Sequence, residues 1–135
     1  MTRDSLLPFT KLVLVVSAAV QLIFGVVGEF FTNLFNSFFW TAPLNAWPID
    51  IAHFAFLNYL ATGIAALYAL KQGSWQGARV YFAFSLSYIT FSVIVTVLAA
   101  TSSGVPPIMW LYVLLSVIYL PAVVWAWQKQ SASKG

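Results

Sequence analysis

The sequence contains no cysteine and very few charged residues. Its 135 residues include only six Lys and Arg, three Asp and Glu, and one His. The absence of cysteine excludes disulfides, thiolate metal sites, cysteine-ligated iron–sulfur clusters and thiol redox chemistry. Charged residues make up 7% of the chain, against roughly a quarter in soluble domains, so an ordinary soluble domain is excluded as well.

Apolar residues dominate the chain. They account for 61% of it, and the mean hydropathy is +0.90. Because a hydrocarbon core of ~30 Å needs about 20 apolar residues per helix, four long apolar stretches can each cross a bilayer. We therefore predict an all-α integral membrane protein with a single domain over residues 1–135. The predicted transmembrane helices cover about 10–28, 50–70, 76–100 and 106–128, followed by a polar tail over 129–135.

The basic residues predict the topology. They flank the first helix, the turn between the second and third, and the end of the fourth: Arg3, Lys11, Lys71, Arg79, Lys129 and Lys134. The other two connections, about 29–50 and 101–107, contain none. By the positive-inside rule, both termini are cytoplasmic and the four helices form an antiparallel bundle. We expect a bacterial cytoplasmic membrane. The dispersed basic residues exclude a nucleic-acid footprint.

The outer segment between the first two helices is amphipathic and aromatic. Its apolar residues fall on one helical face, with two tryptophans around a proline-containing turn beyond them. This pattern is typical of an aromatic belt at the membrane interface, and the alternative is a lid or a docking surface for a partner. The candidate docking residues are Phe35, Phe38, Phe39, Trp40 and Trp47.

Polar side chains inside the spans form stripes at helical spacing. Gln21, Asn58, Tyr88 and Ser116 fall at similar membrane depth, and Tyr119 continues the stripe of the fourth helix. Lipid cannot hydrogen-bond these groups, so they face inward or face another protein. The first interpretation is hydrogen bonding between helices. The alternative is a semi-polar cavity that holds a small ligand.

Three ionisable residues, Glu29, Asp50 and His53, lie near the outer face. Asp50 suits a helix cap, and Glu29 suits a solvated interface. His53 can make a structural hydrogen bond or form a proton relay with Asp50 or Glu29. The alternative is an axial ligand to a haem or chlorophyll-type pigment, and Met109 is then the candidate second haem ligand. We expect no bound cofactor and keep the haem or pigment as an alternative.

The sequence shows no arrangement of catalytic residues. It has no carboxylate pair within a helix, no nucleophile elbow, no phosphate-binding glycine loop and no second histidine for a metal cluster. We predict a protein that is not an enzyme.

The general plan resembles the DoxX-like group of small bacterial four-helix membrane proteins. The resemblance is carried by Gly25 and Gly28 at the end of the first helix, the aromatic outer loop, the small-residue stretch 59–67 and Arg79 after the short turn. Some members of that group are linked to quinone-coupled respiratory complexes. The resemblance implies an accessory membrane subunit and carries over no catalytic residue.

Three functions follow from these features. The first is a non-catalytic accessory or structural subunit of a larger respiratory or photosynthetic membrane complex, with lipids and other subunits, or a second copy of the chain, as partners. The second is a binder or carrier of a quinone-like or other lipophilic molecule in a cavity inside the bundle. The third is a subunit that binds a haem or a pigment through His53.

Overall fold

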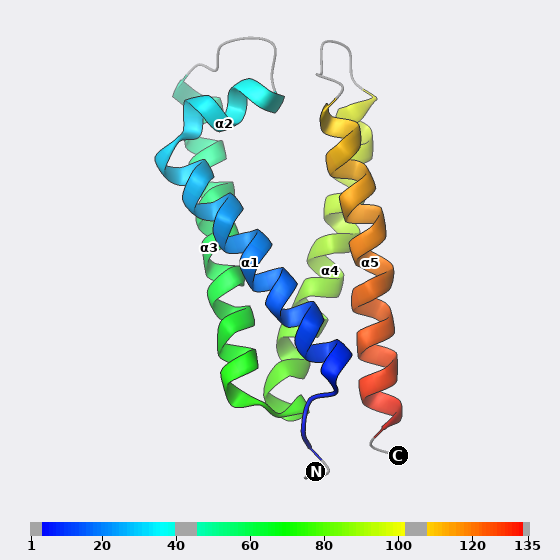
Figure 1. The fold of residues 1–135 in the computed structure, drawn as a ribbon. Helices are drawn as coiled ribbons and strands as arrows, with labels where there is room; N and C mark the ends of the chain where they lie inside the picture. Colours follow the sequence, from blue (N-terminus) through cyan, green and yellow to red (C-terminus); the bar gives the residue numbers. More distant parts are fainter. Residues whose placement is uncertain (1–3, 40–45, 102–107, 134–135) are drawn as a thin grey trace.

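The computed structural model describes residues 4–39, 46–101 and 108–133, which form five helices (Figure 1). Within these ranges the only strand-like pairing is an isolated bridge between Ser5 and Ser74. The helices are α1 (Pro8–Phe30), α2 (Thr32–Phe39), α3 (Ala46–Gln72), α4 (Trp75–Ala100) and α5 (Ile108–Ala132). Four of them, α1, α3, α4 and α5, are long and apolar enough to cross a membrane, as the sequence predicts.

The helices are longer than predicted. α3 begins at Ala46 instead of Asp50 and includes Pro48 in its first turn, where a proline removes no intrahelical hydrogen bond. α5 runs to Ala132 and includes four residues that we assigned to the polar tail. Gln130 explains this extension, because it is fully buried and hydrogen-bonded to the N-terminal segment. Polarity alone suggested a solvated tail, whereas the amide finds partners inside the protein.

The long helices pack as two pairs. The most extensive contacts are between α1 and α3 and between α4 and α5. Glycines bring α1 and α3 together: a Cβ atom at Gly25 would lie 2.6 Å from Leu60 Cγ and 2.9 Å from its backbone nitrogen. Gly63 of α3 fits in the same way against Leu22 of α1. Small residues at such crossings allow the close packing that holds helices together in lipid.

One end of the molecule holds the two pairs together, and we call it the termini end. The Leu6 amide donates to Gly73 O at 3.2 Å, and the Trp75 amide donates to Asp4 O at 2.9 Å. Gly73 has a φ of +64°, which glycine adopts freely at the C-terminus of a helix. The described chain begins and ends here, and the pairs diverge from this end (Figure 1). Most of the buried apolar core also lies here, including Leu6, Trp75, Phe82, Val123 and Ala126.

The short helix α2 lies across the opposite end, the α2 end, and contacts both α3 and α5 (Figure 1). Its first residue, Thr32, is buried and donates a hydrogen bond to Gly28 O at 2.7 Å. Phe31 and Leu34, both on the predicted apolar face, are exposed. A helix therefore forms in this segment and contacts both pairs at the α2 end.

Candidate functional site

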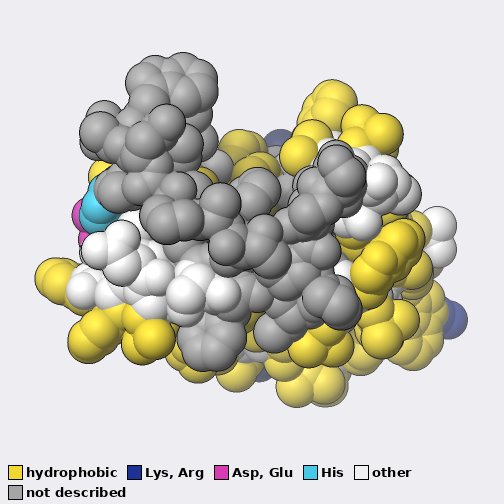
Figure 2. Space-filling view, turned by 90° about the horizontal axis from the view of Figure 1, so that it is seen from above, with side chains coloured by type: hydrophobic (Ala, Val, Ile, Leu, Met, Phe, Trp, Pro, Cys, Tyr) yellow, Lys and Arg dark blue, Asp and Glu magenta, His cyan; other side chains and the backbone are white. Residues whose placement is uncertain are grey.

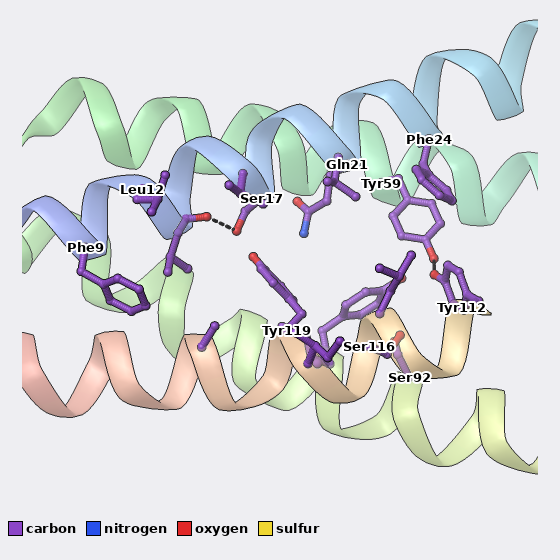
Figure 3. Close-up of a pocket in the computed structure, with 18 residues that line it drawn as sticks. Phe9, Leu12, Ser17, Gln21, Phe24, Tyr59, Ser92, Tyr112, Ser116 and Tyr119 are labelled. Carbon is purple, nitrogen blue, oxygen red and sulfur yellow. Dashed lines mark hydrogen bonds between the residues drawn. The ribbon is translucent and has the colours of Figure 1, made fainter. Parts of the chain in front are cut away.

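A cavity of about 420 Å³ lies between the two helix pairs (Figure 3). Apolar side chains of α1 and α5 make up most of its wall, and α3 and α4 contribute a smaller part. The lining residues from α1 are Phe9, Leu12, Val13, Val16, Ser17, Val20, Gln21 and Phe24. Those from the other helices are Tyr59, Tyr88, Ile89, Ser92, Tyr112, Leu115, Ser116, Ile118, Tyr119 and Ala122.

The cavity brings together four of the five residues that the polar stripes singled out. Gln21 comes from α1, Tyr88 from α4, and Ser116 and Tyr119 from α5. The fifth, Asn58, does not line the cavity. Its neighbour Tyr59 does, because adjacent residues on a helix point about 100° apart. The sequence indicates which side chains are polar but leaves the rotation of α3 open.

Two buried polar groups in the cavity wall have no hydrogen-bond partner. Gln21 is 8% exposed and its Oε1 atom has no hydrogen-bond partner. The Tyr119 hydroxyl also has no partner at hydrogen-bond geometry, although it interacts with the hydroxyl of Tyr81 on α4. Figure 3 shows Tyr119 pointing across the cavity toward α1, where Ser17 and Gln21 lie. The Ser17 hydroxyl already has a partner, because it donates a hydrogen bond to Val13 O at 2.6 Å. A buried unpaired polar group costs ~1–3 kcal/mol, so a ligand group that bonds these atoms would remove that cost. Neither atom is exposed to the cavity, so a small shift of each side chain is needed to reach a ligand.

Tyrosines form the end of the cavity nearer α2. The hydroxyls of Tyr59 and Tyr112 are hydrogen-bonded to each other, which links α3 to α5 (Figure 3). The Phe24 ring lies 6.2 Å from each of these two rings, and Tyr88 meets Tyr59 edge-on at 6.4 Å. We did not single out Tyr59 or Tyr112 as ligand-binding residues from the sequence. The available signal was their phenolic hydroxyl groups within apolar spans, which need a partner when buried.

The cavity wall is uncharged, since none of its residues is Asp, Glu, Lys, Arg or His. The predicted ionisable residues Glu29 and His53 lie outside the cavity wall. His53 Nδ1 lies 3.0 Å from Glu29 Oε2, at ion-pair distance but without hydrogen-bond alignment. Neither residue lines the cavity. Seen from the α2 end, the histidine and an acidic side chain show together at one edge of the molecule (Figure 2).

The structure brings together Glu29 and His53, one of the two predicted relay pairings. The side chains of Asp50 and Met109 lie outside the described residues. So do those of Phe35, Phe38, Phe39 and Trp47, and Trp40 lies outside as a whole. Among the described side chains, no group of three His, Cys, Asp or Glu residues gathers to hold a metal ion.

Comparisons with known proteins add nothing to this site. No protein-family model, no curated protein and no solved structure matches the chain.

Proposed function

We propose that this protein binds a small lipophilic molecule in the cavity between its two helix pairs. The observation that carries the proposal is the unpaired, buried Gln21 amide in the wall of an otherwise apolar cavity. Ligand sites are mostly apolar, with a few polar groups that fix the orientation of the ligand, and have volumes of roughly 300–1,000 Å³. The cavity of about 420 Å³ fits both criteria. A quinone-like molecule belongs to the class of ligand that we propose.

The basic residues support an orientation for this binder. Lys11, Lys71, Arg79 and Lys129 belong to helix segments at or next to the termini end. We propose that this end faces the cytoplasm of a bacterial cell, with the four long helices antiparallel across the cytoplasmic membrane. On this orientation the α2 end faces outward and the cavity lies within the bilayer.

A role in a larger membrane complex is compatible with ligand binding and remains a prediction, as does membership of the DoxX-like group. The same holds for a haem or pigment on His53. That residue contacts Glu29 and does not line the cavity, so pigment binding would need a second site.

Two matched substitutions test the binding proposal. The protein is extracted from its native membrane in mild detergent, and bound small molecules are identified by mass spectrometry. Gln21→Leu removes the unpaired amide from the cavity, whereas Asn58→Leu removes an amide outside it. We expect a co-purifying lipophilic molecule in the unmodified protein, its occupancy to fall at least tenfold in Gln21→Leu, and no change in Asn58→Leu. An empty native protein, or equal loss in both variants, would contradict the proposal.

A further inference from the structure

The cavity is open toward the lipid side of the bundle. Five of its apolar wall residues keep a large exposed fraction: Leu12 56%, Val16 42%, Val20 48%, Leu115 52% and Ile118 60%. These residues belong to α1 and α5, which contact each other much less than each contacts its own pair partner. The gap between α1 and α5 lies within the apolar spans and not at a helix end. A ligand can therefore enter sideways from the hydrocarbon phase.

The cavity offers nothing to balance a charge. Its wall contains no ionisable side chain other than tyrosine, and neither the charged residues of α1, Lys11 and Glu29, nor His53 of α3 line it. Placing a charge in the middle of a membrane costs at least ~2.5–3.5 kcal/mol. Because the cavity has no counter-charge, this cost lowers the affinity for a ligand with a charged headgroup.

The unpaired polar groups suit a hydroxyl headgroup. The Tyr119 hydroxyl points from α5 across the cavity toward α1, where the Gln21 carboxamide lies (Figure 3). A hydroxyl can donate to the amide oxygen and accept from the phenol at the same time. Beyond these two groups, toward Phe9 and Leu12, the wall is apolar and suits a hydrocarbon chain. The volume of about 420 Å³ is that of a site for one drug-sized molecule.

We infer, on the basis of the proposed binding function, that the ligand is an uncharged single-chain amphiphile with a hydroxyl headgroup. It enters from the lipid phase between α1 and α5, and its hydroxyl binds between Gln21 and Tyr119. Its hydrocarbon chain lies along the apolar walls of α1 and α5.

The test compares probes that share one chain length and differ only in the headgroup. The purified protein is placed in nanodiscs of zwitterionic lipid and titrated with a long-chain alcohol, the matching alkane, the alkyl sulfate and the alkyl trimethylammonium ion. Native mass spectrometry gives the bound fraction. We expect the alcohol to bind at least tenfold more tightly than the alkane and than either charged probe. Tyr119→Phe should remove most of the preference over the alkane, whereas Tyr68→Phe, at an exposed position outside the cavity, should not.

The results separate the two proposals. If no probe binds, the binding function itself is contradicted. If a charged probe or the alkane binds as well as the alcohol, the cavity binds ligands but the hydroxyl inference is wrong. The access route has its own pair of variants: Val20→Trp narrows the gap, and Ile23→Trp on the same helix lies outside the cavity. If the alcohol binds equally fast to both variants, the proposed entry between α1 and α5 is wrong.

Discussion

Gly25 shows how single residues determine the spacing of the helices. Its missing side chain allows the backbone of α3 at Leu60 to approach α1, and the neighbouring Gly28 fits against the ring of Phe56. The contact at Gly25 includes a backbone atom, which cannot move aside as the end of a side chain can. The rigid α1–α3 pair that results fixes one wall of the cavity.

We expect Gly25→Ala to destabilise the fold by ~1–3 kcal/mol, since an added methyl group overpacks this crossing. Equilibrium unfolding in mixed detergent measures the change. Gly77→Ala is the milder comparison, because the nearest neighbour of its new Cβ, Gln72 Cβ, lies 3.0 Å away, against 2.6 Å for Leu60 Cγ at Gly25. Equal stability of the two variants would mean that α1 and α3 are not in close contact at Gly25.

Gln130 connects helix α5 to the N-terminal segment through hydrogen bonds. Its amide oxygen accepts from the Leu7 amide at 2.7 Å, and its Nε2 atom donates to Ser5 O at 3.1 Å. These bonds connect the α4–α5 pair to the segment that leads into α1. Since the two pairs diverge from this end, the connection helps to set the width of the cavity.

Gln130→Ala should lower the free energy of unfolding by ~1–3 kcal/mol, because two main-chain groups lose their partner. The Leu7 amide should also exchange its hydrogen faster, which mass-spectrometric hydrogen exchange can detect. Gln128→Ala, at an exposed position on the same helix, should change neither quantity. Unchanged Leu7 exchange in Gln130→Ala would show that the bond does not protect this amide.

The number and type of the elements could be predicted from the sequence, whereas their rotations could not. Long apolar runs and the Lys71–Ser74 turn specify four long helices, because the bilayer fixes the length of a span. The choice between Asn58 and Tyr59 as a lining residue depends on how α3 rotates against α1. Interlocking of Gly63 with Leu22 decides that rotation. Gln130 was misjudged because its partners lie more than 120 residues away in the chain.

The whole molecule has a defined orientation across the membrane in our proposal, with the termini end in the cytoplasm. The absence of cysteine makes this orientation accessible to labelling, since any introduced thiol is the only one. We expect Gln72→Cys and Ser133→Cys to react with an impermeant maleimide from the cytoplasmic side. Ser37→Cys and Thr101→Cys should react from the opposite side. All four positions are exposed. Labelling of Ser37→Cys and Ser133→Cys from the same side would refute the topology.

We expect a lipophilic ligand to occupy the cavity between the helix pairs. Photo-crosslinking with a diazirine-bearing fatty alcohol, followed by peptide mapping, tests it most directly. We expect crosslinks at cavity residues of α1 and α5, such as Val16 and Leu115, and their loss when unlabelled alcohol is added in excess. Crosslinks spread evenly over outward-facing residues such as Leu67 and Ile94, and insensitive to competitor, would contradict the account.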